Sequence, residues 1–259
     1  MLCTLAAASC GGDDSSSAAP AKDTSGSAEL EVVALGDSEA TGSGDPSGEG
    51  WVGRYAKLLR SEEGVTVRVS NLAADGTTSA DLLSSLRTDA SMRKAVKEAD
   101  IVLLGIGGAD INAGDDAFAA GDCRAEACYE PVFKSFARNI DPIAATIAQL
   151  RGSEKTVIRA IAPMNVLTGA EDVIPQFLRK VATRVGIYQA RAGSRAICDA
   201  MDAHGGQCVQ LLRAFNGPRG TTDGYEKGLL NHEECCYPNG EGQQLIARRV
   251  LETGLAPIR

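Results

Sequence analysis

A serine follows the first apolar run of the chain, in the stretch Gly36-Asp37-Ser38-Glu39. A serine at the turn between a strand and a helix is exposed as a nucleophile needs to be, and a flanking glycine lets a substrate approach. The alternative is a serine that only shapes a turn or caps a helix, and so short a motif leaves that open. Ser38 is therefore a candidate nucleophile.

Three further polar or glycine-rich stretches follow apolar runs or precede the last helix. They contain Gly76, the segment 105–112 and the segment 237–242. In a parallel sheet, ligands bind beyond the carboxyl ends of the strands, where such loops meet. A backbone N–H at Gly76 could then point toward the same place as Ser38.

The elements that must position these loops can be read from apolar periodicity. Short apolar runs alternate with stripes of apolar residues three and four apart, which predicts strands alternating with helices. We expect strands at 30–35, 65–69, 101–106, 157–161 and near 209, helices at 51–59, 79–86, 133–150, 174–203 and around 245–250, and an irregular loop at 213–239. This order predicts one α/β domain with a parallel sheet covered on both faces.

Together these stretches resemble the SGNH hydrolases, also called the GDSL lipases and esterases. The resemblance covers nearly the whole chain from Leu30 to the last helix, and segments 214–218 and 228–230 look like those of secreted actinobacterial-type members. It implies a three-layer α/β/α sandwich around a flavodoxin-like, mostly parallel five-stranded sheet. It also implies hydrolysis of carboxylic esters without a cofactor.

The resemblance assigns roles to individual positions. Ser38 takes the place of the nucleophile, the N–H groups of Ser38 and Gly76 that of the oxyanion hole, and Glu234 that of the acid. Two positions depart from the motifs: Ala109 stands where the family has an asparagine donor, and Tyr237 where it has the histidine base. Losing one oxyanion donor alone typically costs ~2.7–4 kcal/mol of transition-state stabilisation.

Two other residues could replace what is missing. Asn112 could supply the donor, and His232 could supply the base. The second histidine, His204, ends a helix that enters the fifth strand, so it belongs at the opposite edge of the sheet. The alternative for His232 is an exposed loop histidine without a role. If Tyr237 lies beside Ser38 while His232 lies in solvent, a catalytically silent protein that binds a surface glycan or acyl ligand becomes the favoured hypothesis.

Eight cysteines suggest an oxidising compartment, and six of them lie in the expected domain. Their spacing lacks paired Cys-x-x-Cys hooks and histidine is scarce, so no metal site is predicted. Disulfides between Cys123 and Cys128 and between Cys198 and Cys208 are expected. The neighbours Cys235-Cys236 would form a vicinal bridge or cross with another pair.

The N-terminal residues 1–10 resemble the end of a bacterial lipoprotein signal, with Cys10 as the lipidated residue. Residues 11–28 are rich in Ser, Ala and Asp and indicate a flexible tether to a domain at 29–259. The alternative is an uncleaved tail. We expect an extracytoplasmic protein that is attached to a membrane only through this anchor.

The net charge and the composition limit the kinds of partner that the chain is expected to bind. The net charge is −8 and aromatic residues make up 4% of the chain, so neither phosphate attraction nor base stacking is provided. Nucleic acid is therefore not expected as a partner. We expect a monomer that acts on a small-molecule, lipid or glycan ester.

Overall fold

Five parallel strands form the centre of the computed structural model, which describes residues 29–258. Their order across the sheet is β2-β1-β3-β4-β5. The strands are β1 (Glu29–Gly36), β2 (Thr66–Asn71), β3 (Ile101–Gly105), β4 (Val157–Ala162) and β5 (Gln207–Gln210). Every pair is parallel, which confirms the expected five-stranded sheet.

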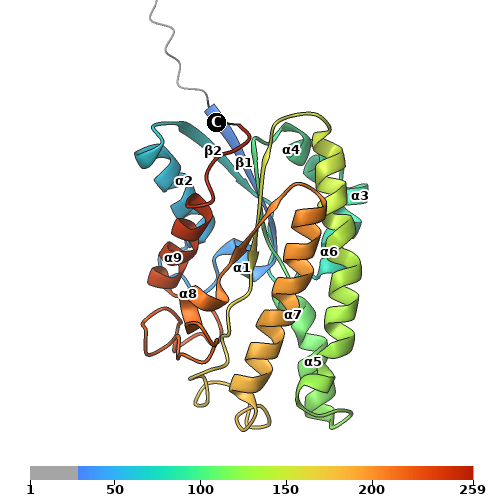
Figure 1. The fold of residues 1–259 in the computed structure, drawn as a ribbon, viewed down its shortest axis with the longest axis vertical. Helices are drawn as coiled ribbons and strands as arrows, with labels where there is room; N and C mark the ends of the chain where they lie inside the picture. Colours follow the sequence, from blue (N-terminus) through green and yellow to red (C-terminus); the bar gives the residue numbers. More distant parts are fainter. Residues whose placement is uncertain (1–28, 259) are drawn as a thin grey trace, which may run out of the picture.

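Helices cover both faces of this sheet, as Figure 1 shows. The helices are α1 (Ser38–Thr41), α2 (Gly50–Glu62), α3 (Ser79–Thr88), α4 (Ala90–Glu98), α5 (Gly108–Ala120), α6 (Glu130–Arg151), α7 (Ala182–Ala203), α8 (Leu212–Asn216), α9 (Gly240–Leu251) and the 3-10 turn η1 (Ala125–Cys128). On one face of the sheet, α2 packs against α9. On the other face, α6 packs against α3, α4 and α7. The three-layer sandwich is thereby confirmed.

Some helices differ from the expectation for physical reasons. Helices α4 and α5 were not predicted. Helix α5 buries only Gly114 and carries no apolar stripe, whereas α4 is short and its stripe consists of the small or partly buried residues Met92 and Ala95 beside Val96. Helix α7 begins at Ala182 rather than at 174: residues 174–181 form turns that still bury Ile174 and Leu178. The expected loop at 213–239 also overlaps the short helix α8.

The carboxyl end of the sheet is held in place by the tight approach of β1 and β3. Gly36 lies opposite Gly105 in the register, and a Cβ at Gly36 would lie 1.7 Å from the Gly105 carbonyl oxygen. Only glycine fits there, with a φ of +138°. The chain leaves β1 at this point, so the close contact also fixes where Ser38 emerges.

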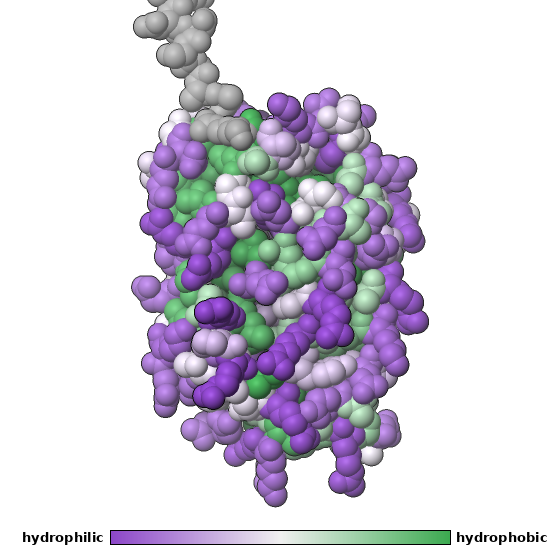
Figure 2. Space-filling model, viewed as in Figure 1, coloured by the Kyte–Doolittle hydropathy of each residue, from purple (hydrophilic) through white to green (hydrophobic). Residues whose placement is uncertain are grey.

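Hydrophilic side chains cover much of the face that Figure 2 shows. Figure 2 shows hydrophobic side chains only as separate areas between hydrophilic ones on the viewed face. Within residues 29–258, the large apolar side chains that are exposed are Leu72, Val173 and Phe177. None of the helices in this range combines the length and the apolar character that crossing a membrane requires.

Candidate active site

Asp37 organises the turn that presents Ser38. Its buried carboxylate accepts the Glu39 N–H (3.0 Å) at the start of α1, together with the N–H groups of Gly107 (2.9 Å) and Gly108 (2.8 Å) before α5. Burial raises the pKa of Asp37, although these backbone hydrogen bonds oppose the rise. One side chain thus fastens the loop after β1 to the loop after β3.

Ser38 opens into a cavity of about 220 Å³ at this edge of the sheet. Most of the cavity wall is apolar, and helices α5, α6 and α7 contribute to it. Its lining side chains include Ile106, Ile111, Phe133, Phe136, Ile161, Met164, Leu167 and Ile197. Such a chamber suits an apolar acyl group placed beside the serine hydroxyl.

The candidate oxyanion donors occupy different places. Asn112 on α5 lines the cavity with Ser38, as its proposed role requires. The side chain at Ala109 offers no donor, and its N–H is bonded to Asp37 (3.3 Å). Gly76 lies in an exposed turn with a φ of +78°, outside the cavity lining. A hydrogen bond from the Thr41 hydroxyl to Asp75 (2.6 Å) ties this turn to α1.

His232 is not brought to Ser38. Its side chain is exposed and lies outside the cavity lining, with its ring centroid 5.0 Å from that of Tyr225. No hydrogen bond joins His232 to Ser38 in the part of the chain described here. Tyr237 does line the cavity together with Ser38. The structure therefore places Tyr237, and not His232, at the cavity, and the role of His232 as the base stays a prediction.

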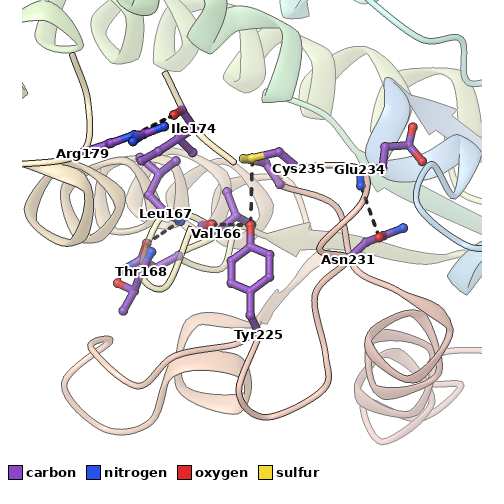
Figure 3. The surroundings of a disulfide bond; sticks show 11 residues. Val166, Leu167, Thr168, Ile174, Arg179, Tyr225, Asn231, Glu234 and Cys235 are labelled. Carbon is purple, nitrogen blue, oxygen red and sulfur yellow. Dashed lines mark hydrogen bonds between the residues drawn. A yellow bond between two sulfur atoms is a disulfide. The ribbon is translucent and has the colours of Figure 1, made fainter. Parts of the chain in front are cut away.

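Local hydrogen bonds explain why this loop turns outward. The Asn231 side chain accepts the N–H groups of Glu233 (2.8 Å) and Glu234 (3.3 Å), which closes a short turn around His232. Figure 3 shows Asn231 reaching Glu234 in this way. The Asn231 N–H also donates to the Tyr237 carbonyl oxygen (2.9 Å). Glu234, the predicted acid, is exposed and is not among the residues that line the cavity.

The disulfides follow the expected pairing. Cys123 is bonded to Cys128 and Cys198 to Cys208, and the neighbours Cys235-Cys236 form a vicinal bridge. The vicinal bridge is part of the cavity wall. Behind it, the Tyr225 hydroxyl donates to the Val166 carbonyl oxygen (3.0 Å), as seen in Figure 3. The remaining predicted residue, Cys10, lies outside the described residues.

Sequence reasoning missed Glu39 as a site residue. Its half-buried side chain lines the cavity next to Ser38. Burial, and secondly the nearby charge of Asp37, raise its pKa from 4.5 to about 8. The signal was available: a carboxylic acid directly follows the candidate nucleophile and directly precedes the buried Ala40.

A second carboxyl group, that of Asp115 on α5, also lines the cavity. It accepts a hydrogen bond from the Tyr129 hydroxyl, and burial raises its pKa. At the far end of α7, His204 caps the helix and contacts Asp141 (2.9 Å), away from the cavity, as expected. Residues 29–258 contain no group of three or more His, Cys, Asp or Glu side chains placed to hold a metal ion.

A serine at the carboxyl edge of a five-stranded parallel sheet, beside an apolar chamber, is the arrangement expected of a hydrolase with a three-layer α/β/α fold. The family model of the GDSL-like lipase/acylhydrolase family matches residues 34–245, and the chain belongs to this family. This membership supports esterase or lipase activity, that is, the class of carboxylic ester hydrolases.

One curated relative matches part of the chain. The Bacillus subtilis (strain 168) protein YpmR is 46% identical over 81 residues, which is 31% of this chain and 31% of YpmR. The match therefore spans about a third of the length of that curated relative.

Solved structures share the fold at low identity. The lipase Lip_vut3 from a goat rumen metagenome has a TM-score of 0.73 and 18% identity, with 89% of this chain and 100% of that chain covered. A lipase/acylhydrolase from Enterococcus faecalis (TM-score 0.54, 18% identity) covers 86% of this chain and 94% of its own. An acetylxylan esterase, Axe2, from Geobacillus stearothermophilus (TM-score 0.53, 18% identity) covers 86% and 93%.

Proposed function

We propose that this chain hydrolyses carboxylic esters of short acyl groups through Ser38, outside the cell membrane. The observation that carries the proposal is the position of Ser38: it stands at the start of α1, held by Asp37, and lines an apolar cavity. The volume of about 220 Å³ lies below the ~300–1,000 Å³ that is usual for drug-sized ligands. A short acyl ester, such as an acetylated glycan, therefore suits it better than a long-chain lipid.

The reaction would proceed as acyl transfer to serine. The Ser38 oxygen attacks the ester carbonyl carbon, the alcohol leaves with a proton, and water then releases the acid from the acyl-enzyme. The N–H groups of Ser38 and Gly76, together with the Asn112 amide, are the groups proposed to bind the oxyanion. Each well-placed donor is worth ~2.7–4 kcal/mol, so Asn112 would compensate for the donor that Ala109 lacks.

The proton acceptor sets the expected rate. A serine hydroxyl is a weak nucleophile without a base, and the cavity holds Tyr237 where a histidine would act. We therefore expect hydrolysis that is slow and rises with pH as hydroxide becomes available. If His232 served as the base after a loop movement, His232→Ala would instead abolish hydrolysis, because Ser38 would lose its proton acceptor.

The same loop favours a second candidate function, as the criterion drawn from the sequence requires, whereas the family membership and the position of Ser38 favour hydrolysis. Tyr237 in the cavity and an exposed His232 are the arrangement that fits a catalytically silent member of the family, which binds an acyl or glycan ligand without turnover. Binding would still use the apolar chamber, whose wall does not depend on either residue alone.

Covalent labelling separates the two candidates. Wild-type protein, Ser38→Ala and His232→Ala would be treated with a fluorophosphonate probe and assayed with p-nitrophenyl acetate. A hydrolase labels at Ser38, loses hydrolysis in Ser38→Ala and retains it in His232→Ala. Equal rates for wild type and Ser38→Ala, with no labelling, would refute serine hydrolysis and leave the binding protein.

A further inference from the structure

The cavity beside Ser38 has an unbalanced set of charges. Two carboxyl side chains line it, those of Glu39 and Asp115, whereas no Lys, Arg or His side chain is among its lining residues. A carboxylate taken out of water normally requires a cation or several hydrogen bonds. The protein provides such partners elsewhere: buried Asp45 contacts Arg54 at 3.0 Å.

Glu39 differs from the other carboxyl group in having no protein partner. Asp115 accepts the Tyr129 hydroxyl, but within residues 29–258 no donor reaches the Glu39 carboxyl group. The Glu39 backbone, by contrast, is fixed at both ends, since its N–H donates to Asp37 (3.0 Å) and its carbonyl accepts the Trp51 indole (2.7 Å). A rigidly held acid thus faces the cavity with its bonding capacity unused.

The rest of the wall is of the kind that accepts organic cations. Phe133 and Phe136 lie edge to face, with centroids 6.4 Å apart, and Tyr237 adds a third aromatic ring to the lining. Aromatic rings attract ammonium groups through their negative faces, and they do so best where water is excluded. Carboxyl groups and aromatic rings together form a recognisable environment for an alkylated ammonium group.

We propose that this cavity selects esters that carry an ammonium group, and that Glu39 is the residue that determines this specificity. The inference rests on the proposed function only in taking an ester as the ligand, because recognition of the cation does not require hydrolysis. The ligand supplies the positive charge that the protein itself does not place opposite Glu39.

The titration behaviour of Glu39 supplies an independent signature. With its pKa at about 8, the group holds its proton at pH 7 in the empty cavity, since Asp37 is nearby and Asp115 and Tyr237 line the same wall without any cation. A bound ammonium group would stabilise the carboxylate and lower that pKa. Binding at pH 7 should therefore release a proton, and affinity should rise between pH 6 and pH 9.

A matched pair of esters tests the proposal without requiring turnover. Acetylcholine and its uncharged isostere 3,3-dimethylbutyl acetate would be titrated calorimetrically into Ser38→Ala at pH 7 and pH 8.5, in buffers of different ionisation enthalpy. We expect the protein to bind acetylcholine more tightly than the uncharged ester, and to bind acetylcholine about tenfold more tightly at pH 8.5 than at pH 7. Binding of acetylcholine at pH 7 should release a proton, whereas binding of the uncharged ester should not. Tetramethylammonium binding to the wild-type protein provides the same comparison should Ser38→Ala fail to fold.

Variants identify the residue responsible. Glu39→Gln should abolish both the preference and the proton release, while Glu154→Gln, an exposed acid outside the cavity, should change neither. Equal affinity for the two esters, or an unchanged preference in Glu39→Gln, would overturn the proposal. Hydrolysis rates of the wild-type protein distinguish the proposed hydrolysis from the proposed selectivity. Preferential binding of acetylcholine without hydrolysis would refute only the hydrolysis. Equal hydrolysis of both esters would refute only the selectivity.

Discussion

At the scale of single residues, the neighbouring acids Asp37 and Glu39 have opposite effects on the stability of the folded protein. Asp37 is buried and satisfied by backbone N–H groups from two loops. Glu39 has no such donors, so burial weighs against its charge without compensation, and its pKa rises to about 8. Asp37 stabilises the geometry of the site. Glu39 lowers the stability of the folded protein, and we propose that it is kept because it binds a cationic ligand.

This cost of Glu39 should be visible in the pH dependence of stability. The unfolded chain ionises Glu39 near its ordinary pKa of 4.5, whereas the folded protein keeps the proton until about pH 8. The free energy of unfolding therefore falls as pH rises between these values. Glu39→Gln should remove this fall and stabilise the protein at pH 8 by ~2–4 kcal/mol, with little change at pH 4.5. Urea unfolding of the wild type and of Glu39→Gln at pH 4.5 and pH 8 measures this difference in the free energy of unfolding. An equal stabilisation at both pH values would contradict a raised pKa of Glu39 as its cause.

Restoring the family residues should reveal what the two substitutions cost. Tyr237→His combined with Ala109→Asn returns a base and an oxyanion donor to the cavity edge. We expect hydrolysis of p-nitrophenyl acetate to rise by at least ~10²-fold, because one donor alone is worth about that much. Tyr237→Phe is the control for loss of the tyrosine without gain of a base. A double variant no faster than this control would mean that the loop geometry itself prevents catalysis.

The same residues show where sequence reasoning succeeds and where it stops. Ser38 could be placed because the chain must turn at Gly36, where β1 meets β3. The outward position of His232 could not, since it depends on the Asn231 side chain closing a local turn and on the ring of Tyr225. Such side-chain contacts leave no periodic signal in the sequence.

At the scale of elements, buried strands and amphipathic helices could be predicted, whereas helices without an apolar stripe could not. The strand at 101–105 consists of buried residues throughout, and helix α6 buries a regular apolar face. Helix α5 forms instead because the Asp37 carboxylate binds the amides at its start, and Gly114 lets Tyr129 approach. That stabilisation comes from tertiary contacts.

The disulfides should contribute unequally to stability because they close loops of different length. Cys198–Cys208 spans 10 residues and ties α7 to β5, whereas Cys123–Cys128 spans 5. Loop-closure entropy predicts losses of ~2.7 and ~2 kcal/mol for the paired alanine variants. Replacing Cys235 and Cys236, which close no loop, should mainly alter ligand binding at the cavity wall. Urea unfolding of the three double variants gives the order, and a largest loss for the vicinal pair would contradict it.

At the scale of the whole molecule, the proposed anchor can be tested directly. If Cys10 carries the lipid, the full-length protein expressed in its natural host should fractionate with membranes, and Cys10→Ser should release it. Ser9→Ala serves as the neighbouring control. Unchanged fractionation in Cys10→Ser would favour plain secretion over a lipid anchor.

The direction of the first strand adds a consequence for the substrate. β1 begins at Glu29, at the amino end of the sheet, and runs toward Ser38 at the opposite end, so the domain is joined to its N-terminal segment on the side away from the cavity (Figure 1). Attachment through that segment would therefore leave the entrance to the cavity at the end of the domain opposite the point of attachment.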